Sequence, residues 1–128
     1  MSDEDEIKEV TEKMMKAFTD GDVKIIIKNM DFKETKQIWA AFFGVTDKRA
    51  QMSDKDFEKD YKREIEMIYN RPWNKSWTID SIEIKDHEKW KRATINVNAE
   101  GAKSIFMPLI LSNQSKKWKM IQIPAWSF

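Results

Sequence analysis

The chain has 128 residues, of which 41% are hydrophobic and 35% charged, with three glycines, three prolines and a formal net charge of +1. This length fits one domain with a single core, and the composition is typical of a globular protein rather than a disordered or repetitive one. The absence of cysteine excludes disulfides and thiolate sites, and a single histidine excludes a metal site built from several histidines. We therefore expect one domain over residues 1–128, without a metal or other cofactor.

Charge is distributed unevenly along the chain. Residues 1–22 carry eight acidic side chains and three lysines, whereas residues 85–119 carry eight basic side chains and three acidic ones. Within the basic region, KDHEKWKR and KKWK interleave lysine with tryptophan, as in proteins that stack on single-stranded nucleic acid. Both segments lie at predicted hairpin ends, where lysine is expected, and an overall basic balance is absent. We interpret the asymmetry as a solvated surface and do not expect nucleic acid as a partner.

The amino-terminal sequence MSDEDEIKEV is acidic, and no stretch of the chain approaches the ~20 apolar residues of a membrane span. We expect no membrane span and, for the chain as given, a cytoplasmic location. Removal of a signal peptide would leave the same sequence in an extracytoplasmic protein, because a lack of cysteine fits either compartment.

The first half of the chain predicts helices. Ser2 before an acidic run is a helix start, and apolar residues then recur at helical spacing until Gly21 ends the helix. Asp22 is a cap for a short second helix, DVKIIIKNM. Asp31 with Glu34 resembles a capping box before FKETKQIWAAFF, which predicts a helix, with a strand as the alternative. The longest predicted helix, SDKDFEKDYKREIEMIYN, starts at a Ser-x-x-Asp cap and ends before a proline.

The last third of the chain predicts an antiparallel meander. Turn sequences at hairpin spacing separate four segments rich in β-branched and aromatic residues: WTIDSIEI, RATINVNA, SIFMPLIL and WKMIQI. In the first segment the apolar residues change phase, which predicts a β-bulge at Asp80 or Ser81 that restores one buried face. Pro108, inside the third segment, cannot donate to a ladder and predicts an edge position or a second bulge. Two such breaks indicate a strongly curved sheet.

The tail PAWSF follows the last predicted strand. Pro124 ends that strand because it has no N–H to donate, and two large aromatic residues so close together are rare in a disordered tail. We expect Trp126 and Phe128 to be ordered and packed against the helical layer or a partner subunit.

Helices followed by a bent antiparallel meander resemble the nuclear transport factor 2-like superfamily. FTDGDVKIIIKNM is similar to the end of that superfamily's first helix and the short helix after it, and the stretch from RATINVNA to WKMIQI resembles its closing pair of long strands. The matching positions are Gly21, Asp22, Val23, Ile27, Ala93, Ile95, Val97, Trp118, Lys119 and Met120. Residues 32–52 depart from the family pattern.

This resemblance implies a cystatin-like α+β fold, in which about three helices pack on a curved four-stranded antiparallel meander. It also implies a cone-shaped cavity between sheet and helices, and frequently a dimer across the sheet. Among the branches of the superfamily, small uncharacterised bacterial and archaeal domains are the most similar.

Some members of that superfamily are enzymes of the steroid isomerase, scytalone dehydratase and limonene epoxide hydrolase types, with acid and base side chains inside the cone. Asp80 is a weak candidate base, because a bulge could turn its carboxylate inward, with Tyr61 or Tyr69 as the hydroxyl partner. The alternative interpretation of the tyrosines is core packing with hydroxyls at the rim. His87 lies in the turn DHEK, so we expect it to be exposed and outside any cavity. No phosphate loop, Ser-His-Asp set or carboxylate cluster with metal spacing occurs.

We therefore predict a non-catalytic module that binds a small ligand or another protein. The alternative is a small isomerase- or dehydratase-type enzyme with a cone-shaped pocket, which requires an enclosed cavity containing at least two convergent polar groups. Apolar residues of both phases in SIFMPLIL predict a homodimer through the sheet face, and a small apolar ligand is the other predicted partner. The predicted pocket or interface residues are Trp39, Phe43, Phe106, Trp126 and Phe128.

Overall fold

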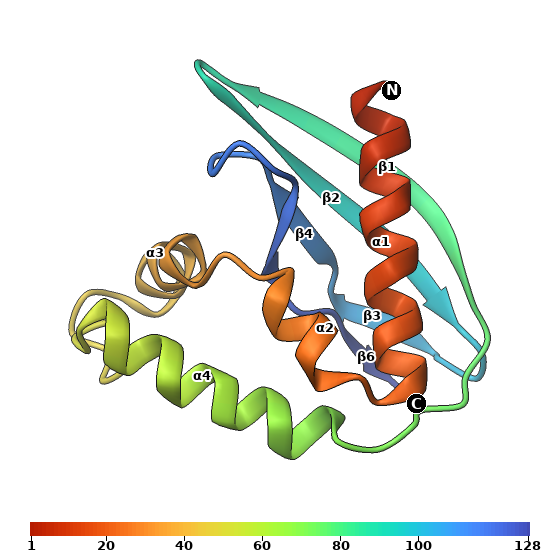
Figure 1. Ribbon diagram of the computed structural model, residues 1–128, viewed down its shortest axis with the longest axis horizontal. Helices are drawn as coiled ribbons and strands as arrows, with labels where there is room; N and C mark the ends of the chain where they lie inside the picture. Colours follow the sequence, from red (N-terminus) through yellow and green to blue (C-terminus); the bar gives the residue numbers. More distant parts are fainter.

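The computed structural model describes residues 1–128 and has four helices followed by six strands (Figure 1). The helices are α1 (Asp3–Asp20), α2 (Val23–Lys28), α3 (Phe32–Phe43) and α4 (Asp54–Tyr69). The strands are β1 (Trp77–His87), β2 (Trp90–Ala99), β3 (Ser104–Met107), β4 (Leu109–Ser112), β5 (Lys119–Gln122) and β6 (Ala125–Ser127). The predicted α+β class is confirmed, with four helices where the resemblance implied about three.

The predicted helix starts are confirmed because each carries its own capping side chain. Ser2, Asp22, Asp31 and Ser53 each accept a hydrogen bond from the backbone N–H three residues later, at 3.2, 3.3, 3.1 and 3.1 Å respectively. These bonds satisfy N–H groups that have no partner within the helix. The segment FKETKQIWAAFF forms the predicted helix, α3, and not the alternative strand. No helix is both long and apolar enough to cross a lipid bilayer.

Strands β1, β2, β4 and β5 form one antiparallel sheet in that order. The register between β1 and β2 skips Asp80, which confirms the predicted bulge. On either side of the bulge, Ile79 lies opposite Val97 and Ile82 lies opposite Ile95. The extra residue therefore keeps both isoleucines on the face that carries the buried side chains of β2.

The segment SIFMPLIL forms two strands, so the prediction of a single strand there is wrong. Pro108 separates β3 from β4 because it has no N–H for a ladder. Strand β4 continues the four-stranded sheet, whereas β3 pairs antiparallel with β6 in a second, two-stranded sheet. Strand β6 lies in the tail PAWSF, so the tail is ordered, as predicted. The apolar residues of SIFMPLIL are divided between the two strands: Leu109 and Leu111 of β4 lie in the core, and Phe106 of β3 is exposed.

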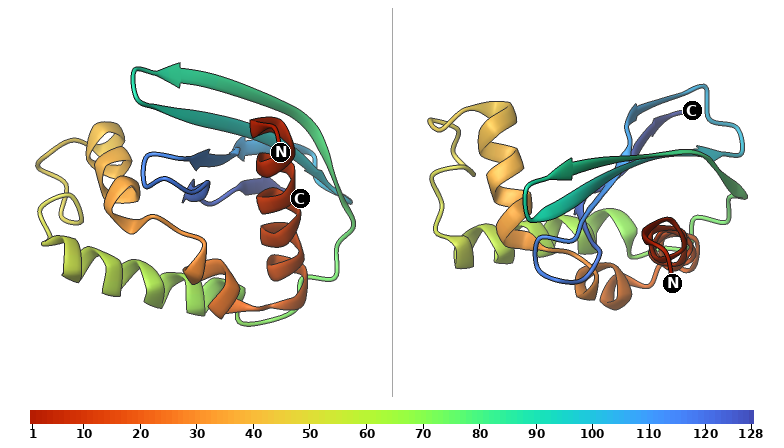
Figure 2. Two further views of the ribbon diagram at one scale, coloured as in Figure 1. Left: turned by 45° about the horizontal axis from the view of Figure 1, so that its top comes forward. Right: turned by 90° about the horizontal axis from the view of Figure 1, so that it is seen from above.

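Helices α1, α2 and α4 lie on one side of the four-stranded sheet, and α3 stands beside its end (Figure 2). Apolar side chains fill the space between these helices and the sheet. Those with no exposed surface are Ile7, Met14, Met15, Ile26, Phe57, Ile65, Ala93, Ile95, Leu109, Leu111 and Met120. The interior of the predicted cone is thus occupied by the hydrophobic core.

The face of the β1–β2 hairpin that points away from the core is polar. Its cross-strand pairs are Thr78 with Asn98, Ser81 with Asn96, Glu83 with Thr94, and Lys85 with Arg92. The exposed apolar residues of SIFMPLIL, Phe106 and Met107, lie on β3 instead. A homodimer that buries these two residues would therefore use the two-stranded β3–β6 sheet, which we call the small sheet.

Candidate functional site

Three hollows surround the turn between β4 and β5, residues 113–118. The largest is a groove of about 670 Å³ between this turn, α1 and the end of α2. Its lining residues are Met1, Glu6, Glu9, Val10, Lys13, Lys28, Asn29, Asn113, Lys116, Lys117, Trp118 and Lys119. We name it the lysine groove, after the five lysines in this set.

Backbone hydrogen bonds bring the walls of the lysine groove together. Met120 in β5 donates its N–H to the carbonyl of Asn29 at 2.8 Å and accepts from the N–H of Asp31 at 3.0 Å. The link between α2 and α3 thereby covers the free edge of β5. As a result, Lys28 at the end of α2 and Lys119 at the start of β5 line one groove although they are far apart in the sequence.

Lys116 occupies a strained position in the turn. Its φ of +82° lies in the left-handed region, which costs a residue other than glycine roughly 1–2 kcal/mol. Its N–H donates to the carbonyl of Asn113 at 2.9 Å, which closes the turn. Strain of this kind is concentrated at ligand-binding and catalytic positions. The turn thus holds Lys116 in a conformation that glycine would adopt at lower cost.

None of the five groove lysines forms an ion pair. The cations that do so are Lys8, Lys16, Lys36, Arg49, Lys62, Lys91 and Arg92. Glu6 and Glu9 are the two carboxylates in the groove, so five positive charges against two negative give its lining a net charge of +3. Ammonium groups without carboxylate partners around a concave surface attract anions from solution.

Trp118 contributes an indole to the groove and is 7% exposed. The α1 wall next to it is held by Asp3, whose carboxylate lies 2.6 Å from the ammonium of Lys91 in β2. That ammonium is the main cause of a lowered pKa at Asp3. The indole N–H of Trp118 is buried and has no partner at hydrogen-bond distance.

A buried carboxylate, Glu34, lies at the third hollow, which measures about 300 Å³. Glu34 is 3% exposed, accepts a 2.9 Å hydrogen bond from the hydroxyl of Ser112, and lies 3.5 Å from Nη2 of Arg92. Burial raises the pKa of the Glu34 carboxyl, while Ser112 and Arg92 oppose that rise. The capping role predicted for Asp31 is confirmed, but the side chain of Glu34 turns to β4 instead of completing the box.

The second hollow, about 400 Å³, lies at the tip of the β1–β2 hairpin and includes His87 and Trp90 in its lining. His87 is half-buried, and its ring stacks on Trp90 at a centroid distance of 4.0 Å. The expectation of an exposed His87 outside any cavity is therefore wrong. The guanidinium of Arg92 lies 4.9 Å from the Trp90 ring centroid. Because Trp90 is engaged by both neighbours and Trp118 is buried, little ring surface is left for stacking on nucleic acid bases.

The candidate catalytic residues lie in separate places. Asp80 is exposed at the bulge in β1, and no hydrogen bond or ion pair joins it to a tyrosine. Tyr61 in α4 packs on Phe57 and burial raises its pKa to about 12; burial also raises the pKa of Tyr69, well above its ordinary value. None of the three lines the hollows around the β4–β5 turn.

We expect Asp80→Asn to change the free energy of unfolding by no more than about 0.5 kcal/mol, as for other exposed substitutions. The side chain is exposed and makes no polar contact that the substitution would remove. Urea denaturation of the two proteins measures the difference. An NMR titration in which the Asp80 carboxyl stays protonated at neutral pH would instead support the alternative of an isomerase- or dehydratase-type enzyme.

The predicted pocket or interface residues fall into two groups. Trp39 and Phe43 lie on α3 and contact each other at a ring centroid distance of 4.5 Å, with Phe43 half-exposed. Phe106, Trp126 and Phe128 belong to the β3–β6 end of the chain. Phe106 and Phe128 are exposed there, whereas Trp126 is half-buried.

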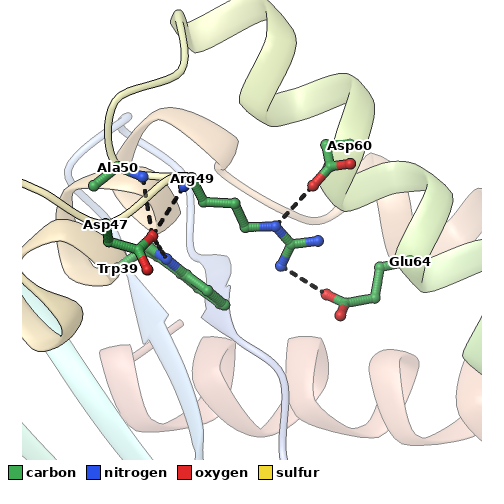
Figure 3. A network of polar contacts seen from close by, with 6 residues as sticks. All are labelled: Trp39, Asp47, Arg49, Ala50, Asp60 and Glu64. Atoms are coloured by element: carbon green, nitrogen blue, oxygen red, sulfur yellow. Dashed lines mark hydrogen bonds and ion pairs between the residues drawn. The ribbon is translucent and has the colours of Figure 1, made fainter.

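Polar contacts fix the loop that follows α3, residues 44–53 (Figure 3). The indole N–H of Trp39 donates to Asp47 at 2.6 Å, and Asp47 also accepts from the backbone N–H of Arg49 at 2.9 Å. The Arg49 side chain reaches α4, where it pairs with Asp60 at 2.7 Å and Glu64 at 3.1 Å. The predicted interface residue Trp39 is thus part of a scaffold that ties this loop to α4.

No family model, curated protein or solved structure matches the chain. Function is therefore inferred from the side chains themselves. The feature that sequence reasoning missed is the lysine groove, whose lysines come from three separate segments. In the sequence only KKWK stands out as a cluster, and its position predicts a solvated hairpin end.

Proposed function

We propose that this chain is a non-catalytic binding module whose lysine groove takes a small anionic ligand. The observation that carries the proposal is the convergence of five lysines, none with a carboxylate partner, on one concave surface. The side-chain amide of Asn113 adds hydrogen-bond donors, as does the second N–H of the Asn29 amide, whose first N–H donates to the carbonyl of Ile25 at 2.8 Å. A volume of about 670 Å³ lies within the range of small-molecule sites.

The chemistry of the lining favours phosphate, sulfate or carboxylate groups over the small apolar ligand predicted from the sequence. Only Met1, Val10 and Trp118 in this lining are hydrophobic. An apolar ligand would leave the ammonium groups unpaired, whereas an anion would pair with them.

We further propose that the domain is a nuclear transport factor 2-like one with a cystatin-like fold. The order of helices before sheet, the bulged first strand and the three helices on one side of a four-stranded antiparallel sheet support this. The filled core and the separation of Asp80 from Tyr61 and Tyr69 support the binding module over an isomerase- or dehydratase-type enzyme.

The groove is tested by binding of inositol hexasulfate, a probe whose charge is constant with pH. We expect the double variant Lys116→Gln/Lys117→Gln to bind roughly five- to tenfold more weakly, because each exposed charge pair contributes up to about 1 kcal/mol. Isothermal titration calorimetry gives the affinity. Two-dimensional NMR locates the probe through the side-chain amides of Asn29 and Asn113 and the indole N–H of Trp118.

The matched control is Lys55→Gln/Lys59→Gln, which removes the same charge from exposed positions on α4 outside the groove. We expect this control to keep most of the affinity, apart from a small long-range effect that salt screens. Equal losses in the two double variants, or NMR shifts spread over the whole surface, would show non-specific attraction and overturn the proposal.

A further inference from the structure

The buried carboxylate of Glu34 is connected to the turn that carries two of the groove lysines. The Ser112 hydroxyl, which donates to Glu34 at 2.9 Å, also accepts the backbone N–H of Gln114 at 3.2 Å. Ser112 is itself 2% exposed, so water is a poor substitute for either bond. Glu34 therefore fixes the first residues of the turn from the side of α3.

The next residue extends this connection toward the groove. Asn113 donates its N–H to the carbonyl of Lys91 at 3.1 Å and accepts the N–H of Lys91 on its side chain at 2.6 Å. The carbonyl of Asn113 then accepts the N–H of Lys116, the residue held at φ +82°. A continuous set of hydrogen bonds thus leads from Glu34 through Ser112 and the turn backbone to Lys116.

We propose that Glu34 is a positioning residue of the lysine groove, and that the charge of its carboxylate couples the affinity of the groove for anions to pH. This inference rests on the proposed function. Ionised Glu34 accepts from Ser112 and pairs with Arg92. Protonation removes the attraction to Arg92, which has no other ion-pair partner and whose Nε is already buried without a hydrogen bond. The neutral carboxyl still accepts from Ser112, but this hydrogen bond is weaker without the negative charge, so Glu34 holds Ser112, Arg92 and the turn less firmly.

The groups around Glu34 set the direction of the pH dependence. Arg92 on β2 favours the ionised form, Asp31 at the start of α3 disfavours it, and burial disfavours it most. Lys33 lines the same hollow, and Lys119 is the β5 partner of Ser112. Because the pKa is raised, acidification neutralises Glu34 before ordinary glutamates, while the groove lysines stay charged. Affinity should therefore fall as the pH falls through the pKa of Glu34.

The test compares the wild-type chain with Glu34→Gln, using inositol hexasulfate between pH 8 and pH 4. We expect the wild type to lose roughly fivefold or more in affinity as Glu34 protonates, and Glu34→Gln to bind weakly at every pH without that step. Glu66→Gln, an exposed carboxylate on α4 without an ion pair, is the matched control and should keep the wild-type profile. His87 lines the second hollow together with Asn113. We therefore add His87→Gln to the wild type, to Glu34→Gln and to Glu66→Gln, so that any pH dependence that remains does not come from this histidine.

A second measurement needs neither the ligand nor a variant. The carbon resonance of the Glu34 carboxyl and the backbone amides of residues 114–118 should titrate with one midpoint in the free wild-type chain. Different midpoints, or an unchanged affinity and pH profile in Glu34→Gln, would overturn this inference and leave the groove intact. Failure of Lys116→Gln/Lys117→Gln to weaken binding would overturn the proposed function instead. If Glu34→Gln does not fold, Ser112→Ala interrupts the same connection without changing charge and should also weaken binding.

Discussion

Gly21→Ala is expected to lower the free energy of unfolding by about 2–4 kcal/mol, the largest effect of any single substitution considered for this chain. Gly21 ends α1 at φ +71°, where an L residue costs roughly 1–2 kcal/mol. A Cβ at this position would also lie 2.8 Å from the carbonyl carbon of Arg71 and 2.9 Å from the nitrogen of Pro72. Both contacts are to backbone, which cannot rotate away, so the link after α4 would have to shift. Thermal unfolding followed by circular dichroism should show a melting temperature lower by about 10 °C.

Gly101→Ala separates the cost of a positive φ from the cost of the close contact with the Arg71–Pro72 backbone. Gly101 has φ +82°, but a Cβ there would meet only a side-chain atom of Phe128 at 3.9 Å, an ordinary contact. Its expected cost is therefore the conformational one alone, about 1–2 kcal/mol. If both variants melt at the same temperature, the close approach of Gly21 to the Arg71–Pro72 backbone is not an energetic constraint.

Gly21 and the bulge at Asp80 show which features of the fold can be predicted from the sequence nearby. Gly21 was predicted to end a helix because the reason is local, namely the left-handed conformation that follows the last turn. The bulge at Asp80 could also be predicted, because a change of apolar phase within one strand has few physical remedies. The approach of Arg71 to Gly21 depends on how α4 returns to α1, and nothing near Gly21 in the sequence encodes that path.

The same limit explains what was missed at the candidate site. Glu34 matched a capping box, a local motif, and the sequence gives no sign that its side chain is needed by Ser112 on a distant strand. The one available signal is that Glu34 precedes Ile38, an apolar residue of the predicted helix FKETKQIWAAFF, by four residues, which places both on the same side of that helix. The lysine groove depends on the contact between Asn29 and Met120, which periodicity within either segment cannot predict.

The tail is a further case in which the local sequence predicts an ordered segment but does not predict which parts of the chain pack against it. Pro124 and two aromatic residues indicated an ordered end, and β6 supplies it by pairing with β3, Ile105 opposite Trp126. Trp126 stacks on Trp73 at a centroid distance of 4.7 Å and donates its indole N–H to the carbonyl of Val97 at 3.1 Å. The tail therefore joins the small sheet, the loop after α4 and strand β2.

Deletion of residues 125–128 should consequently lower the melting temperature by about 4–10 °C. The half-buried ring of Trp126 contributes part of the roughly 1.5–3 kcal/mol of a fully buried aromatic side chain, and β3 would lose its only paired strand. Differential scanning calorimetry of the full chain and the truncated chain measures the shift. Phe128→Ala is the control: the side chain is half-exposed and should account for the smaller part of the loss, with Trp126→Ala accounting for the larger. A truncated chain that melts within about a degree of the full one would show that the contacts of Trp126 with Trp73 and Val97 do not stabilise the fold.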